Sequence, residues 1–369
     1  MSSDSNGEYP NDHALKLSLI VAILLGVLVL CSIFSHYGSY EGLFASLFYV
    51  FYLGAWCWVN LPFHVGAKGP LESLGGGFWV TWIRGLLVAF LCGAVSDFAT
   101  FECDPFIFFG AYGLAAIGDA LDGAAARWTQ TVSAMGARLD NQVDAMGMFV
   151  ASIGAILLET LPPYYLLLSI VYFIFHFGMW LRERMGLEVF RDRMMQSLHN
   201  RYFAGVHMCL LTVALYPGAA SEILAIIASF GLFLLLLCFV RDWLYVSGVV
   251  KPGDSRAKRG WSRASGFARH YGSVGARFFI GTILALGLYS SLPWWLIALC
   301  FLAALGLFSR TLAWLCLAYF VLGHNPSVSV EIFLLTGALT WVAWLGSGHW
   351  SITKQDDALY FRTMSVNTL

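Results

Sequence analysis

The chain consists of long apolar stretches separated by short polar segments. A helix needs about 20 mainly apolar residues to cross the roughly 30 Å hydrocarbon layer of a membrane. On this criterion the pattern predicts twelve transmembrane helices, several of them short. The predicted spans are 16–34, 43–60, 78–97, 105–126, 142–160, 163–181, 203–217, 223–244, 276–291, 293–308, 310–323 and 329–346.

Composition supports this interpretation. Hydrophobic residues make up 59% of the chain and charged residues 12%, with a mean hydropathy of +0.72; a soluble domain has about 25% charged residues. The first fourteen residues lack a basic region, so we expect the first apolar stretch to be a retained span. A net charge of −1 gives no indication of nucleic-acid binding. We therefore predict an all-α polytopic integral membrane protein.

The basic residues test the predicted topology. If the N-terminus is cytoplasmic and the chain alternates sides, all 21 Lys and Arg residues lie at the cytoplasmic ends of spans. Most of them fall in two loops, 182–201 and 251–277. Positive charge is enriched in cytoplasmic loops of membrane proteins. The sequence thus predicts that both termini are cytoplasmic.

Four aspartates lie close together in the stretch GDALDGAAARWTQTVSAMGARLDNQVD. They are Asp119 and Asp122, followed by Asp140 and Asp144. On two successive helices each pair occupies one face, so the two pairs can face each other. A carboxylate near the membrane costs about 2.5 to 3.5 kcal/mol, and crowded carboxylates repel, so cations must hold them. Oxygen-only ligands favour Mg²⁺ or Mn²⁺, and two such ions could bind a pyrophosphate. The alternative, a solvated acidic helix face, fits poorly with the scarcity of charge elsewhere.

The same stretch has the pattern D-x2-D-G-x2-A-R-x8-G-x3-D-x3-D, which resembles the signature of the CDP-alcohol phosphotransferases. All eight fixed positions match, which chance would give in about one chain in 10⁸ of this length. The resemblance implies that all four aspartates bind metal and that Asp144 also acts as general base on the acceptor hydroxyl. It further implies a CDP-binding set of Gly123, Ala126, Arg127 and Gly136, whose small residues leave room for the nucleotide.

The resemblance extends over residues 70–250, which we expect to form a catalytic core of six helices. It includes Thr81-x2-Arg84, which is similar to the family's T-x2-R. The other predicted parts are a two-span extension at 1–69, a flexible basic cytoplasmic linker at 251–275, and a four-span accessory domain at 276–369. Residues 275–352 weakly resemble a DoxX-type membrane domain. We expect the core to pack without the accessory helices.

Several arginines are candidates for binding a phosphorylated acceptor, because the planar guanidinium suits phosphate. Arg84 lies about two turns inside its predicted span, where it must either reach the surface or face the site, and we favour the site. Arg182, Arg191 and Arg241 lie near cytoplasmic ends of core spans. The loop arginines can also serve only as determinants of topology.

We therefore expect a metal-dependent enzyme of phospholipid biosynthesis that transfers a substituted phosphoryl group from a CDP-alcohol, CDP-diacylglycerol, to a hydroxyl acceptor and releases CMP at the cytoplasmic face. One alternative is a CDP-choline or CDP-ethanolamine type of phosphotransferase acting on a lipid alcohol. Another is a non-catalytic transporter or redox-associated membrane protein. The sequence does not identify the acceptor, and it leaves open whether the chain forms a homodimer.

Overall fold

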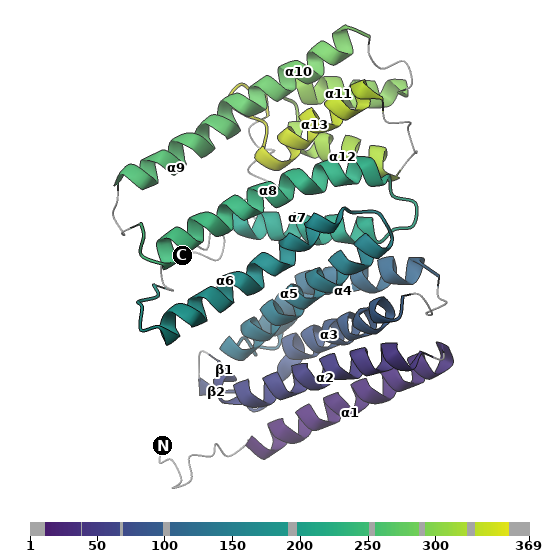
Figure 1. The fold of residues 1–369 in the computed structure, drawn as a ribbon, viewed down its shortest axis with the longest axis vertical. Helices are drawn as coiled ribbons and strands as arrows, with labels where there is room; N and C mark the ends of the chain where they lie inside the picture. Colours follow the sequence, from purple (N-terminus) through teal and green to yellow (C-terminus); the bar gives the residue numbers. More distant parts are fainter. Residues whose placement is uncertain are drawn as a thin grey trace. The chain divides into compact units, whose positions relative to one another are not determined.

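The computed structural model describes residues 12–37, 39–66, 69–98, 104–190, 198–250, 255–287, 292–322 and 329–353. The described part is predominantly α-helical, as Figure 1 shows. It divides into two compact units. Unit 1 comprises Met1–Leu158 and Leu211–Pro217, and unit 2 comprises Glu159–Leu210 and Gly218–Leu369.

Unit 1 is built around α3, which contacts α2, α4 and α5. A short hairpin precedes α3, with Val65 paired to Pro70 in antiparallel register. The helices of unit 1 are α1 (Asp12–Tyr37), α2 (Tyr40–Asn60), α3 (Gly75–Ser96), α4 (Phe106–Trp128) and α5 (Ala134–Leu157), and between α2 and α3 lie η1 (Leu61–Phe63), β1 (Val65–Gly66) and β2 (Gly69–Pro70).

Glycines on α3 allow its neighbours to approach closely. A Cβ atom at Gly77 would lie 2.6 Å from the Cβ of Ala126 on α4. A Cβ at Gly85 would lie 2.6 Å from Cδ2 of Leu53 on α2. Small residues commonly permit such close packing between membrane helices. The middle of α3 is therefore enclosed by its neighbours, and side chains there are buried.

Unit 2 begins with a 3₁₀ turn and contains the remaining helices. Within it α8 contacts α6, α12 and α13, while α10 contacts α11 and α13. Its elements are η2 (Pro163–Leu166), α6 (Leu167–Arg184), α7 (Leu198–Ala214), whose last residues belong to unit 1, α8 (Ser221–Val246), α9 (Ser255–Phe267), the π-helical turn η4 (Ala268–Gly272), α10 (Ser273–Ala285), α11 (Trp294–Leu305), α12 (Ser309–Leu322) and α13 (Val330–Leu345).

The core of unit 2 includes Trp344 of α13. Its indole lies against Gly231 of α8, where a Cβ would collide with the ring. Its centroid is 5.6 Å from that of Phe203 and 5.2 Å from that of His207, both on α7. The hydroxyl of Tyr202 donates a hydrogen bond of 3.0 Å to the carbonyl of Ala343. Helices α7 and α8 therefore pack against α13 within unit 2, and independent packing of the helices up to residue 250 stays a prediction.

Each of the twelve predicted spans overlaps a helix, but the helices differ in length. Six are long and apolar enough to cross a membrane among the described residues: 13–37, 40–63, 75–96, 106–128, 163–184 and 221–246. Four apolar helices are shorter, and α5 carries Arg138, Asp140 and Asp144 in its first half. The protein has the helices of an integral membrane protein, while twelve crossings are not confirmed.

The predicted flexible linker at 251–275 contains regular structure. Helix α9, the turn η4 and α10 follow one another without a break from Ser255 to Ala285 (Figure 1). The segment 255–285 contains no proline, so every residue can take part in helical hydrogen bonding. Residues 255–275 are thus helical, while residues 251–254 lie outside the described part.

Candidate functional site

Two consecutive helices carry the four aspartates. Asp119 and Asp122 lie on α4, and Asp140 and Asp144 lie on α5. Ser133 caps α5. Its Oγ accepts a hydrogen bond of 3.1 Å from the backbone N–H of Gly136, the third residue of the helix. A cap of this type satisfies an N–H that the helix leaves unpaired. The cap fixes where α5 begins, and thereby which face carries its carboxylates.

Arg84 of α3 lies at the centre of the four carboxylates. Arg84 is only 2% exposed to solvent. Nη1 forms ion pairs with Asp122 and, at 2.6 Å, with Asp140; Nη2 forms ion pairs with Asp119, at 3.2 Å, and with Asp144. A guanidinium can bind several carboxylates because its donors are fixed in one plane. Arg84 therefore joins α3, α4 and α5 in one charged cluster.

Arg84 reaches the cluster across α4 at Gly118. A Cβ at Gly118 would lie 2.7 Å from Cγ of the arginine. The Nε of Arg84 also donates a hydrogen bond of 3.0 Å to the carbonyl of Ala115, on the same face of α4. Sequence reasoning missed Gly118, although it directly precedes Asp119 in the motif. Only the position of α3 reveals why a side chain is excluded there.

The four carboxylates differ in their access to solvent. The side chain of Asp122 is 9% exposed, and Thr81 places its hydroxyl 3.2 Å from the Oδ2 of this carboxylate. The side chains of Asp119, Asp140 and Asp144 are 38%, 31% and 23% exposed. Asp122 is thus held by α3 on two sides, whereas the other three remain open to a ligand.

The accessible carboxylates fit a divalent cation. Asp119, Asp140 and Asp144 each offer one oxygen, and these three oxygens lie within 4.8 Å of one another. Four ionised carboxylates against one guanidinium leave a formal charge of −3. Oxygen-only donors are the ligands that Mg²⁺ and Mn²⁺ prefer. The donor atoms and the uncompensated charge therefore both suit these ions.

The residues predicted to bind CDP have different surroundings. Gly123 and Arg127 share one face of α4, where a Cβ at Gly123 would lie 3.3 Å from Nη1 of the exposed Arg127. Ala126 instead packs against α3, and the backbone N–H of Gly136 is the one bound by the cap of α5. Small size at Ala126 thus has a packing explanation. Binding of CDP by these four residues stays a prediction.

The arginines predicted to bind the acceptor are not gathered in one unit. Arg84 is engaged by carboxylates, as described above. Arg182 and Arg241 lie in unit 2. Nη2 of Arg182 donates a hydrogen bond of 2.9 Å to the carbonyl of Ser247. Arg241 forms an ion pair of 2.7 Å with the adjacent Asp242. Arg191 lies outside the described residues. Acceptor binding by these arginines stays a prediction.

Comparison with known proteins agrees with the motif. No curated protein and no solved structure matches the chain. The family model described as CDP-alcohol phosphatidyltransferase matches residues 78–240. The matched segment contains Arg84 and all four aspartates, and it supports phosphotransfer from a CDP-alcohol to an alcohol. Residues 78–240 are thus similar to the CDP-alcohol phosphatidyltransferase family, which supports the resemblance of the aspartate motif.

Proposed function

We propose that the protein transfers the phosphatidyl group of CDP-diacylglycerol to the hydroxyl of a small polar alcohol and releases CMP. The observation that carries this proposal is the convergence of three accessible carboxylates, beside a fourth that is buried, around one arginine. The family match supports the CDP-alcohol donor. A lipid-linked donor is consistent with the apolar helices that carry the site. The basic loops favour a phosphorylated acceptor, because arginine and lysine pair with phosphate.

In this proposal the carboxylates of Asp119, Asp140 and Asp144 hold Mg²⁺ or Mn²⁺, with two ions expected. Asp122, which the motif also predicts as a ligand, is 9% exposed, and its role as a metal ligand stays a prediction. Bound ions supply positive charge to the diphosphate of the donor. Arg84 orients the carboxylates of Asp119, Asp140 and Asp144, because its guanidinium forms ion pairs with all of them. Asp122 orients Arg84 in turn, because it pairs with the guanidinium and lies next to the hydroxyl of Thr81. Gly123 and Arg127 are proposed to receive the CDP moiety.

The reaction breaks one phosphorus–oxygen bond and forms another. The acceptor hydroxyl oxygen attacks the phosphorus that carries diacylglycerol, and the bond from this phosphorus to the bridging oxygen breaks. CMP leaves with the bridging oxygen. Asp144 takes the proton of the hydroxyl. A carboxylate suits this role when it is partly accessible and held in a fixed orientation, and Asp144 is 23% exposed and paired with Arg84.

We place the site at the cytoplasmic face, with both termini on the same side. CDP-linked substrates are cytoplasmic, and the clusters of Lys and Arg predict the same orientation. Labelling of a cysteine introduced at exposed Arg259 by a membrane-impermeant maleimide tests this placement. We expect labelling only after the cells are opened, and labelling in intact cells would contradict the orientation.

Release of CMP from purified protein in lipid nanodiscs tests the proposed reaction. Wild-type protein is mixed with CDP-diacylglycerol and a panel of alcohols, with Mg²⁺, with Mn²⁺ or with a chelator. We expect Asp144→Asn to lower the rate about 100-fold or more, the contribution of a general base. Asp104→Asn is the matched control, because the Asp104 carboxylate lies outside the aspartate cluster and accepts a hydrogen bond of 3.0 Å from Phe106 N–H at the start of α4.

Four outcomes would contradict parts of the proposal. Wild-type turnover in Asp144→Asn would remove the assigned base, and equal turnover in the chelator would remove the metal requirement. If soluble CDP-choline or CDP-ethanolamine competes with labelled CDP-diacylglycerol and is itself consumed with a lipid alcohol, the donor assignment is wrong. Absence of CMP release with every alcohol and both metals would favour a transport function.

A further inference from the structure

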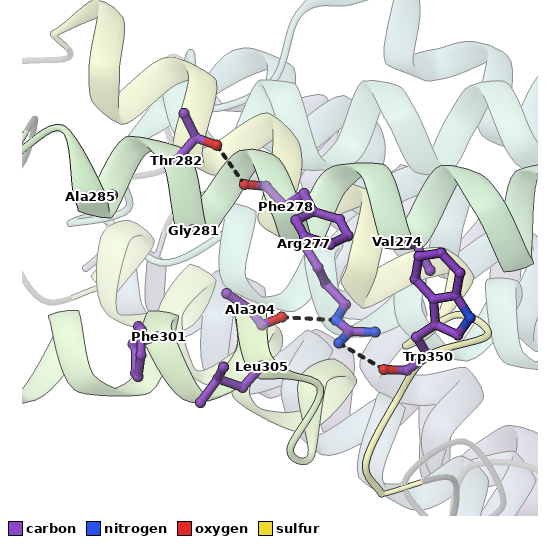
Figure 2. Close-up of a pocket in the computed structure, with 10 residues that line it drawn as sticks. All are labelled: Val274, Arg277, Phe278, Gly281, Thr282, Ala285, Phe301, Ala304, Leu305 and Trp350. Carbon is purple, nitrogen blue, oxygen red and sulfur yellow. Dashed lines mark hydrogen bonds between the residues drawn. The ribbon is translucent and has the colours of Figure 1, made fainter.

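A cavity of about 410 Å³ lies in unit 2 between α10 and α11. One face of α10 lines it from Val274 to Ala285, and α11 contributes Phe301 and Ala304. Figure 2 shows that Arg277 extends from α10 toward the end of α11 and the segment at Trp350. The cavity volume lies within the range of about 300 to 1,000 Å³ that is usual for small-molecule sites.

Arg277 places a buried positive charge at one end of this cavity. The residue is 6% exposed. Its Nε donates to the carbonyl of Ala304 at 3.2 Å, Nη1 to that of Ser347 at 2.9 Å, and Nη2 to that of Trp350 at 3.1 Å. Within the described part of the chain no carboxylate forms an ion pair with it. A guanidinium has five N–H donors, so the three carbonyl bonds leave two donors available, and among the described residues no carboxylate balances the charge.

The remainder of the cavity is lined by apolar residues except for Thr282, whose hydroxyl donates to the carbonyl of Phe278 at 2.9 Å. Gly281, Ala285 and Ala304 contribute little or no side chain, and a Cβ at Gly281 would still be 3.9 Å from the Cβ of Ala304. Ala285 follows Arg277 by eight positions on α10, which correspond to about 12 Å along the helix. Phe278 is 67% exposed. The cavity thus has one cationic end, at Arg277, and a mainly apolar lining along α10 and α11.

We propose that this cavity binds an anionic phospholipid, with its phosphate at Arg277 and an acyl chain along Gly281 toward Ala285. A buried cation that lacks an acidic partner is stabilised by an anion, and guanidinium donors suit phosphate oxygens. The continuous helix preceding the cavity adds Arg259, Arg263 and Arg269, and such juxtamembrane basic residues attract anionic lipid. This site belongs to unit 2 and is independent of the proposed transfer reaction.

Free inorganic phosphate has the same anionic chemistry but leaves the apolar length unfilled. Lipid binding is therefore measured by native mass spectrometry of the full chain in mild detergent, with phosphatidylglycerol, phosphatidylcholine and inorganic phosphate as probes. We expect the wild-type protein to prefer phosphatidylglycerol over phosphatidylcholine about tenfold, because both lipids offer the phosphate to Arg277 but the choline cation of phosphatidylcholine cancels the net negative charge. Inorganic phosphate is expected to compete weakly.

The Gly281→Leu variant tests the role of the cavity without changing Arg277. The added side chain fills the apolar path and leaves the three carbonyl bonds of Arg277 in place, and leucine is a better helix former than glycine. Gly275→Leu is the matched control on the same helix, because nothing lies within 4 Å of a Cβ there. We expect Gly281→Leu to lose the tenfold preference and Gly275→Leu to keep it.

The Arg277→Gln variant should lose the same preference. Retention of the preference in Gly281→Leu, or in an Arg277→Gln protein that elutes as a folded monodisperse species, would overturn the proposal. Equal loss in Gly275→Leu would also overturn it, because the effect would then not come from the cavity. Competition by inorganic phosphate as strong as that of phosphatidylglycerol would show an anion site that takes no lipid chain.

Discussion

Arg84→Met removes the only cation among the four carboxylates of the described site and keeps much of the side-chain volume. Removing one partner of a buried ion pair costs about 3 to 5 kcal/mol. The lower end applies here, because Asp119, Asp140 and Asp144 retain side-chain exposures of 38%, 31% and 23% and are partly screened. A loss of about 3 kcal/mol corresponds to a fall in unfolding temperature of about 6 to 12 °C for a unit of this size.

Thermal unfolding of the purified protein, followed by fluorescence-detected size exclusion, measures this effect with and without Mg²⁺. We expect Mg²⁺ to raise the unfolding temperature of Arg84→Met more than that of the wild type, because the ion replaces the missing positive charge. Arg138→Met on α5 is the matched control, since exposed Arg138 only covers the ring of Phe63 at 4.6 Å. An Arg84→Met protein as stable as wild type in a chelator would refute the reasoning.

Three further variants test the packing, each by thermal unfolding. Gly118→Val places a side chain against Arg84 and should cost about 1 to 3 kcal/mol and most of the CMP release; full activity would show that the arginine has room to move. Trp344→Ala should cost about 3 to 5 kcal/mol, whereas Trp294→Ala, at 81% exposure, should cost little; equal effects would contradict the buried role. Ser133→Ala should lose about 1 kcal/mol of capping, and an unchanged stability would contradict the cap.

The sequence predicts the helix pair that carries the aspartates because helical periodicity and the motif spacing are local properties. It also indicates that Arg84 is unusual, since a charge two turns inside an apolar span needs a partner. It does not show that the arginine pairs with all four carboxylates. That arrangement depends on how α3 lies against α4 and α5, and on the missing side chain at Gly118.

The grouping of the helices could not be predicted from the sequence. Apolar stretches identify where helices run, but one apolar surface packs against many others, so neighbours stay undetermined. The contact between Trp344 and Gly231 joins residues more than a hundred positions apart. It makes α13 part of the same core as α7 and α8. The helical continuity from Ser255 to Ala285 was missed because Gly, Ser and basic residues also fit a linker.

The short helices α11, α12 and α13 have a consequence for the surrounding bilayer. Their 12, 14 and 16 residues rise only about 18, 21 and 24 Å, against a hydrocarbon layer of about 30 Å. Two carbonyls near the end of α11 have side-chain donors, because Arg277 donates to Ala304 at 3.2 Å and Ser351 Oγ donates to Gly306, just beyond the helix, at 2.8 Å. A helix end bonded in this way tolerates an apolar environment. Lipids with shorter acyl chains should therefore gather around these helices and thin the membrane locally, whereas the 26 residues of α8 accommodate a full-thickness bilayer.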